Sequence, residues 1–343
     1  MLLNKKNVER SKSLSIGYSN KNHEMKMRAD KLTMVLNVEV GIDLYERLIK
    51  RLKRMGEGEW EHYETSLIKC KRESKRPSRY RRAVTVSKGG RMFMHIGFEP
   101  INKSNRAMRI DIRPQHLTSE EMNKLIMWLD KRMKGELLPL LDTAWVTQVD
   151  VALDLYGCRL DDYIWGVHNT SKDDSYISEN GLPGVRLGSV RSNLHMLVYE
   201  KVEITGTTRK FREVDGDLDI NLNDHPRFLR IEARIRPDDK PGSKWKAPLM
   251  LKELIKISDP FERLEVYSTR LDTHLEIDKF FRERPKSFTL NAWKRHMGRA
   301  ENTTRLSRRI EGTIEKHKIE LFDKELVWKQ WGKCLESLGS LVK

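Results

Sequence analysis

Hydrophobic and polar residues alternate with a period of two in three segments of the chain, at residues 146–155, 194–203 and 227–236. A period of two is typical of a β-strand with one apolar face. In the first segment the apolar positions are Val149, Val151, Leu153 and Leu155. We therefore predict three strands, each with an apolar face and a polar face.

The polar faces of these strands carry reactive side chains. The first holds Gln148, Asp150, Ala152 and Asp154, the second holds His195, Tyr199, Lys201 and Glu203, and the third holds Phe228, Arg230, Glu232, Arg234 and Arg236. A strand with one charged face is usually solvent-exposed, and each segment alone indicates no more than that. A nucleophile, cations and carboxylates on three nearby strands together indicate tyrosine-based phosphoryl transfer on DNA.

Strand and helix patterns also alternate in the first half of the chain. We predict a strand at 32–40, then an amphipathic helix at 44–55 that ends at a Gly-Glu-Gly breaker. A hairpin follows, with strands at 83–87 and 91–97 joined through Lys88-Gly89-Gly90.

A further strand is predicted at 108–113. Thr118 and Glu121 then form a capping-box pattern, which predicts a helix from there to about residue 134.

Two short sequence matches indicate that this arrangement occurs twice. Residues 38–45 match 149–156, and residues 108–111 match 229–232, in the same order along the chain. We therefore predict an α+β fold of two duplicated antiparallel-sheet-plus-helix halves. The first half covers 32–135 and the second, catalytic half covers 140–240.

The two ends of the chain differ from these halves. Residues 1–31 are basic and lack a sustained apolar period, which predicts a disordered arm. Residues 245–343 follow a Pro- and Gly-containing breaker and are predicted as a basic helical C-terminal region. Its expected helices lie at 249–257, at 260–271 and from 290 towards 338.

The charge balance narrows the class of partner. Lys and Arg number 66 against 50 Asp and Glu, which gives a net charge of +16. The surplus is concentrated at residues 1–31, 69–82 and 281–310, where each stretch can cover several phosphates. Nucleic acid is the expected partner of such a protein.

Cysteine usage and hydropathy indicate the compartment. The three cysteines are too widely spaced for a disulfide framework or a zinc site, which suits a reducing environment. No apolar run approaches the roughly 18 residues of a membrane span. We expect a cytoplasmic protein that does not contact membranes.

Spacing along the strands limits which acids can share a metal ion. Asp150 and Asp154 point the same way but lie about 13 Å apart on a straight strand. Asp150 is therefore the preferred ligand. The turn at 188–193 is small and basic, and we expect it to cradle a phosphate.

Three motifs in order resemble one family: residues 148–154 (QVDVALD), residues 187–203 with Tyr-Glu-Lys at 199–201, and residues 227–234 (RFLRIEAR). They look like the rolling-circle replication initiators that include staphylococcal plasmid initiators and filamentous-phage replication factors. That family usually has Tyr-Asp/Asn-Lys where this chain has Tyr-Glu-Lys. The resemblance covers roughly residues 145–236 and implies a fold distantly related to His-hydrophobic-His nucleases.

The resemblance implies a site-specific DNA nickase and strand transferase. Tyr199 falls at the position of the nucleophile, and it would leave a 5′-phosphotyrosine link and a free 3′-hydroxyl primer. Lys201 would stabilise the phenolate. The expected ligands of a Mg²⁺ or Mn²⁺ ion are Asp150, Glu232 and Asp154, and the expected DNA contacts are Arg191, Ser192, Arg230 and Arg234.

The implied partners are origin DNA, as a single strand or an extruded hairpin, and a host helicase and polymerase. The motifs leave open whether the origin is of plasmid or phage type and whether the chain forms a homodimer.

Two other functions stay open at this point. A non-catalytic nucleic-acid binder built on RRM-like halves would stack bases on exposed aromatic rings. A metal-dependent nuclease would use water and would form no covalent adduct. Attachment of the protein to a single-stranded oligonucleotide discriminates between these functions.

Overall fold

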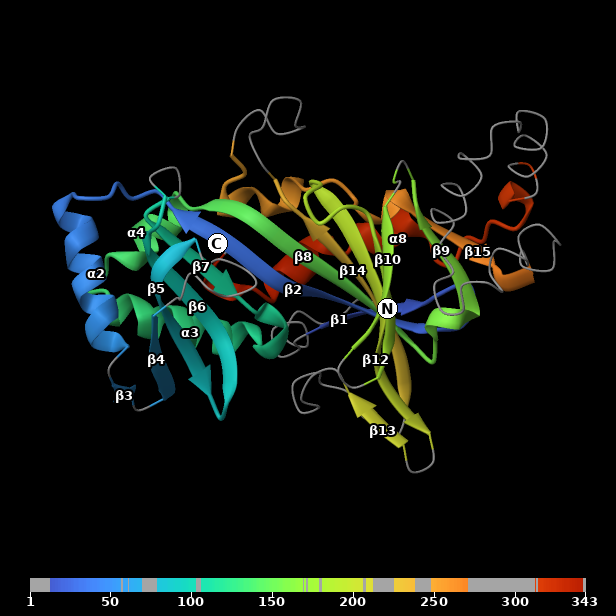
Figure 1. Ribbon diagram of the computed structural model, residues 1–343, viewed down its shortest axis with the longest axis horizontal. Coiled ribbons are helices and arrows are strands. Elements are labelled where there is room, and N and C mark those ends of the chain that lie inside the picture. The colour runs from blue at the N-terminus through green and yellow to red at the C-terminus, as the bar shows by residue number, and fades with distance from the viewer. Residues whose placement is uncertain are drawn as a thin grey trace.

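The computed structural model describes residues 13–56, 58–60, 62–69, 79–102, 106–168, 170, 172–178, 181–205, 208–211, 225–237, 248–270, 312 and 314–341. Within these residues, a mixed α+β fold is built around one 13-stranded sheet in which every pairing is antiparallel (Figure 1). This confirms the predicted fold class and the large antiparallel sheet.

Two long strands form the middle of the sheet. They are β2 (Glu24–Leu36) and β8 (Trp145–Tyr156), which pair with each other. On the β2 side follow β7 (Met108–Ile112), β6 (Arg91–Pro100), β5 (Tyr80–Lys88), β4 (Tyr63–Lys69) and β3 (Glu59–Trp60). On the β8 side follow β14 (Arg227–Ile235), β12 (Leu194–Thr205), β11 (Pro183–Leu187) and β10 (Asp173–Ile177).

Smaller elements complete the fold. The strand β1 (Leu14–Tyr18) pairs with β2, and β13 (Thr208–Phe211) pairs with β12. A separate two-stranded sheet joins β9 (Tyr163–Val167) to β15 (Leu264–Ser268). The described α-helices are α2 (Asp43–Met55), α3 (Ser119–Arg132), α4 (Leu137–Asp142), α8 (Lys324–Trp328) and α9 (Trp331–Glu336). None of them is long and apolar enough to cross a membrane.

The hydrophobic core lies against one face of the sheet. The helices α2, α3 and α4 gather at the β4–β7 end of the sheet (Figure 1). In α2, the residues Leu48, Leu52 and Met55 recur at helical spacing and are buried, as expected of an amphipathic helix. On β8, the four apolar positions of the alternating pattern are all completely or almost completely buried, which confirms that face of the strand.

Local signals of the first half are confirmed in detail. The helix α2 ends at Met55, and Gly56 packs so closely on β4 that an added Cβ would lie 2.7 Å from the Cβ of Leu67. Both glycines of the β5–β6 turn have positive φ, 59° at Gly89 and 77° at Gly90, as a tight hairpin requires. The helix α3 begins with the predicted capping box of Thr118 and Glu121.

The N-terminal prediction is wrong for residues 14–18 and 24–31. These residues form β1 and the first part of β2, and residues 1–12 lie outside the described part of the chain. The reason is a short alternation that the dense charge obscures. Met25, Met27 and Ala29 are buried in the core, whereas the charged residues between them point to the other face.

The two segments of the first internal match differ in structure. Residues 149–156 lie in β8, but residues 38–45 form a loop and the start of α2. Both segments of the second match are strands, because residues 108–111 lie in β7 and residues 229–232 lie in β14, and these two strands flank the central pair on opposite sides.

The C-terminal region is less helical than predicted. Residues 251–256 form a short 3-10 helix, η4 (Leu251–Lys256), and residues 261–268 form η5 (Phe261–Arg263) and the strand β15. The basic stretch at 281–310 lies outside the described residues. Residues 314–341 belong to the core, since Trp331 and Leu335 are buried and the Trp331 indole donates to the Leu254 carbonyl at 2.9 Å.

Candidate active site

The reactive side chains predicted from sequence meet in three rows across β12, β14 and β8. We call the surface that they share the polar face of the sheet. In register order, the rows are Tyr199–Arg230–Asp154, Leu197–Glu232–Ala152 and His195–Arg234–Asp150. Antiparallel pairing places directly opposed residues on the same face, so the three alternating patterns combine into one constellation.

This polar face is buried, although charged strand faces are usually exposed. Asp150, Asp154 and Arg230 are 0% exposed and Glu232 is 5% exposed. Buried charges are destabilising unless each is paired and hydrogen-bonded. The charged residues accordingly form two groups, one around Tyr199 and Asp150 and the other around Asp154, and Arg230 joins them through its contact with Asp30.

The first group links the tyrosine to the carboxylates. The Tyr199 hydroxyl donates to Glu232 Oε2 at 3.0 Å. Arg234 bridges the two acids, because its Nη2 donates to Glu232 Oε1 at 2.6 Å and its Nε donates to Asp150 Oδ2 at 3.0 Å. Gln148 adds a donor to Asp150 at 2.9 Å.

Asp30 joins this group from β2. The register of β2 against β8 shifts between Ala29 and Lys31, and Asp30 is the extra residue of this bulge. Bulges commonly re-aim a side chain beside a functional site. Carboxylate oxygens of Asp30, Asp150 and Glu232 lie within 4.8 Å of one another.

These three carboxylates fit a hard divalent cation. Oxygen donors from Asp and Glu are the ligands that Mg²⁺ and Mn²⁺ prefer. Burial raises the pKa of Asp150 to about 7, and the neighbouring charges of Glu232 and Asp30 act in the same direction against Arg234. Such a site is short of positive charge, which a metal ion supplies.

The second group is a set of paired charges. Asp154 accepts from Arg230 at 2.6 and 3.0 Å and lies 2.9 Å from Arg28 Nη2. Burial alone would raise the pKa of Asp154, but Arg230 and Arg28 outweigh it and hold that pKa below its usual value. The cluster of three carboxylates within 4.8 Å does not include Asp154.

Arg230 corrects one sequence-based prediction. The predicted DNA contact is not available in this structure, because the side chain is completely buried and its guanidinium contacts Asp154, Asp30 and Gln115. The alternating pattern identified the correct face of the strand. It could not show that a partner from β2 and another from η1 (Pro114–His116) would cover this arginine.

Lys201 lies beside the tyrosine, as the sequence spacing predicts. Its Nζ is 5.8 Å from the centroid of the Tyr199 ring, and its side chain is buried. The register of β12 against β14 shifts between Glu200 and Val202, so Lys201 is itself the extra residue of a bulge.

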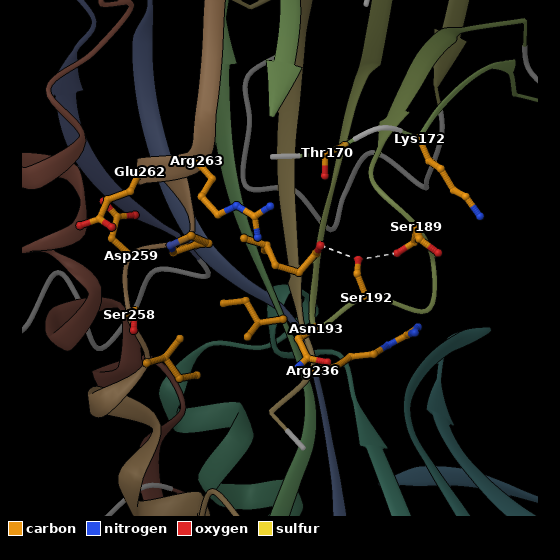
Figure 2. Close-up of a pocket in the computed structure, with 14 residues that line it drawn as sticks. Thr170, Lys172, Ser189, Ser192, Asn193, Arg236, Ser258, Asp259, Glu262 and Arg263 are labelled. Atoms are coloured by element: carbon orange, nitrogen blue, oxygen red, sulfur yellow. Dashed lines mark hydrogen bonds between the residues drawn. The ribbon is translucent and has the colours of Figure 1, made fainter. Parts of the chain in front are cut away.

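The turn before β12 carries the remaining predicted contacts. Arg191 is exposed, and the Ser192 hydroxyl lies 2.6 Å from the carbonyl oxygens of Ser189 and Leu194. Ser192 thereby closes the turn, as Figure 2 shows. Arg236 also holds this turn, because its guanidinium donates to the Val190 carbonyl.

His195 stands at the end of the polar face nearest this turn. It is completely buried, and burial with the positive charges of Arg234, Arg236 and Arg186 lowers its pKa to about 4. The ring is therefore neutral at physiological pH.

Sequence reasoning missed Asp30 and Arg28. Both lie in the segment that was predicted to be a disordered arm. The signal that could have identified them is the alternation of apolar and charged residues at 24–30, EMKMRAD. It has the same period of two as the three alternating segments described first.

Comparisons with known proteins give a similarity to a solved structure and no match to a sequence family. No protein-family model matches the sequence, and no curated protein matches it. A solved structure of a rolling circle replication initiator protein from Geobacillus stearothermophilus matches with a TM-score of 0.32 and 13% sequence identity. The match covers 62% of this chain and 74% of that chain. Similarity at this level says nothing about individual side chains, and the site therefore stands on its own geometry.

Proposed function

We propose that this protein is a rolling-circle replication initiator that cuts one DNA strand with Tyr199. The observation that carries this proposal is the hydrogen bond from the Tyr199 hydroxyl to Glu232, within a buried group of carboxylates. A phenol has an ordinary pKa of about 10 and needs an adjacent proton acceptor to act as a nucleophile at neutral pH. Glu232 is placed to be that acceptor.

The reaction is a transesterification. The Tyr199 oxygen bonds to a backbone phosphorus while its proton passes to Glu232. The bond from phosphorus to the 3′ oxygen breaks, and that oxygen takes up a proton from solvent and leaves as a 3′-hydroxyl. The 5′ side stays attached as a phosphotyrosine, which conserves the bond energy for rejoining.

Neighbouring cations stabilise the charges that form. The ammonium of Lys201 lies near the Tyr199 ring and stabilises negative charge on the phenolate. Arg234 already contacts two carboxylates, and its guanidinium would also donate a hydrogen bond to the phosphate. Arg191 and Ser192 remain proposed contacts to the DNA backbone.

The metal site of this proposal is Asp30, Asp150 and Glu232. A Mg²⁺ or Mn²⁺ ion held there supplies charge that polarises the phosphate. Asp154 is assigned a structural role, because its oxygens are already paired with two arginines.

We further infer that the two sides of the sheet descend from one duplicated unit. Arg109 and Asp111 on β7 correspond to Arg230 and Glu232 on β14, and the strand order on both sides of the central pair supports this. Gly97 pairs with Arg109 just as Tyr199 pairs with Arg230. The first half would then lack the nucleophile, and cleavage would occur in the second half only.

The RRM-like alternative has less support. Base stacking needs exposed aromatic rings, whereas Tyr199 is 6% exposed and Phe228 is 0% exposed. A nuclease that uses water remains the competing reaction, and it differs from the proposal in leaving no covalent adduct.

The test uses a labelled single-stranded oligonucleotide from the cognate origin with Mg²⁺ or Mn²⁺. Wild-type protein should form an adduct at Tyr199, which mass spectrometry locates. Tyr199→Phe should lose both adduct and cleavage by several orders of magnitude. Tyr156→Phe is the matched control, since Tyr156 is a buried strand tyrosine whose hydroxyl has no hydrogen-bond partner within the described residues.

Each contrary outcome identifies a different alternative. Cleavage by Tyr199→Phe without any adduct indicates the water-using nuclease. An adduct on another tyrosine keeps the reaction but rejects the site. Binding without cleavage by the wild type rejects the enzyme altogether.

A further inference from the structure

A cavity of about 570 Å³ opens beside the turn that precedes β12. Figure 2 shows that its walls come from this turn, from the start of β12, from the end of β14 and from the segment around η5. Pockets of roughly 300–1,000 Å³ are typical of small-molecule sites. The cavity is therefore large enough for one nucleotide.

The lining combines three kinds of side chain. Leu194, Ile235, Ile257 and Pro260 provide an apolar wall. Asn193 and Ser258 supply an amide and a hydroxyl group, which can hydrogen-bond to a base or a sugar. The lining also includes the cations Lys172, Arg236 and Arg263 and the acids Asp259 and Glu262, so the cavity offers partners for both a phosphate and a base amino group.

Arg236 connects this cavity to the candidate active site. It lines the cavity, and its Nε lies 3.4 Å from Gln148 Oε1, while the Gln148 amide donates to Asp150. Arg236 follows the last residue of β14 and is four residues beyond Glu232. In an extended chain this separates the two residues by about 13 Å.

A positively charged path lies between the two places. Arg234 on β14 lies directly opposite His195, Arg186 on β11 lies directly opposite Leu197, and Arg236 follows the last residue of β14. Arg186 is one-third exposed, and its ion pair with Asp174 is long at 3.5 Å. Such a group of arginines is suited to the phosphates of a strand that leaves the carboxylate cluster in this direction.

We propose that the cavity binds one unpaired nucleotide of the same strand that Tyr199 cuts. The strand would run from the carboxylate cluster past the three arginines and place that nucleotide beside Asn193 and Ser258. This inference rests on the proposed function. It adds that the protein recognises a position a few nucleotides from the cut, about four at the 3.4 Å rise of a stacked strand.

The experiment measures strand binding without cleavage, in the Tyr199→Phe background. A single-stranded oligonucleotide that spans the mapped cut is made with one abasic position at a time, and its affinity is measured by fluorescence anisotropy. One position near the cut should weaken binding about tenfold when its base is missing, which matches the loss of about two hydrogen bonds.

Filling the cavity tests the site itself. Ser258 is exposed at the rim, so Ser258→Trp should fold normally while its ring occupies the cavity. It should weaken binding of the intact strand by a similar factor and remove the effect of the abasic position. Leu326→Trp is the matched control, because Leu326 is 57% exposed and does not line the cavity.

The outcomes separate the two proposals. If the wild type forms the Tyr199 adduct but Ser258→Trp binds every oligonucleotide as before, the cavity proposal is rejected and the reaction stands. If no adduct forms, both fail. If free deoxynucleoside monophosphates compete for the cavity as strongly as the strand does, the site serves a free nucleotide and the proposal is again rejected.

Discussion

Asp154 holds three strands together through a single carboxylate. It accepts hydrogen bonds from Arg230 on β14 and pairs with Arg28 on β2, and all three side chains are completely buried. Removing one partner of a buried ion pair leaves uncompensated charge, which destabilises proteins far more than the loss of an exposed pair.

We therefore expect Asp154→Asn to lower the free energy of unfolding by about 3–5 kcal/mol, measured by urea denaturation. Asp174→Asn is the matched control, since Asp174 is 64% exposed and 3.5 Å from Arg186. That control should change stability by less than about 1 kcal/mol. Equal effects of the two substitutions would mean that the buried pairs do not stabilise the sheet.

His195 links stability to pH. Its pKa is lowered to about 4 by burial and by the surrounding arginines, whereas an unfolded histidine has a pKa of about 6.5. Between these values the unfolded chain binds a proton that the folded chain does not bind. Stability is therefore lost as the pH falls from about 6.5 towards 4.

Replacing His195 by Asn should remove this contribution. Between pH 7.5 and pH 5, the wild type should lose about 2 kcal/mol more unfolding free energy than His195→Asn. Parallel urea titrations at the two pH values measure the difference. Identical losses in both proteins would show that the imidazole accepts a proton in the folded state.

At the scale of elements, the bulge of β2 decides which side chain reaches the carboxylate cluster. Asp30 is the extra residue, and it lies beside Asp150 and Glu232. Because the proposed metal site draws one of its three carboxylates from this bulge, loss of Asp30 should weaken metal binding without removing the tyrosine.

Thermal unfolding in the presence of Mn²⁺ tests this consequence. A ligand at 100 times its Kd stabilises the folded protein by about 2.7 kcal/mol. The midpoint of wild-type unfolding should rise accordingly, and Asp30→Asn should lose most of that rise. Asp43→Asn, an exposed acid in the first turn of α2, should keep it. A full rise in Asp30→Asn would place the metal elsewhere.

Elements with strong local signals could be predicted from the sequence. The helix α2, the β5–β6 hairpin and the capping box of α3 each depend on residues close together in the chain. The alternation in β8 and β14 likewise identified Asp150 and Glu232. These signals depend on periodicity and turn chemistry, which one sequence displays directly.

Other parts of the site depend on pairings that are distant in sequence. Asp30 meets Glu232 only because β2 pairs with β8 and β14 pairs with β8 from the other side. Asp154 has the same residue type as the proposed ligand Asp150 and lies on the same strand, and only its partners distinguish it. No local pattern contains that information.

At the scale of the whole molecule, the last described residues close the fold against the first. The backbone N–H of Asn20 donates to the Leu321 carbonyl at 2.9 Å, and the N–H of Ser340 donates to Asn123 Oδ1 at 2.6 Å. The helix α9 packs against β2, which is the strand that carries Asp30.

Removing residues 314–343 should therefore abolish cooperative unfolding, as followed by circular dichroism. The milder change Trp331→Ala opens a cavity in the core and should lower stability by about 3–5 kcal/mol. Leu326→Ala should have little effect, because this leucine is 57% exposed. A truncated chain that still melts cooperatively would show that the segment is dispensable.

The contact of α9 with β2 also has a consequence for how the chain folds during translation. The strand β2 forms the middle of the sheet, yet the helix that packs against it is translated long after β2 itself. Pairings over such sequence separations form slowly. A nascent chain that includes Tyr199 but not yet α9 would therefore hold β2 without this packing partner, and the proposed site would be completed only after α9 has been translated.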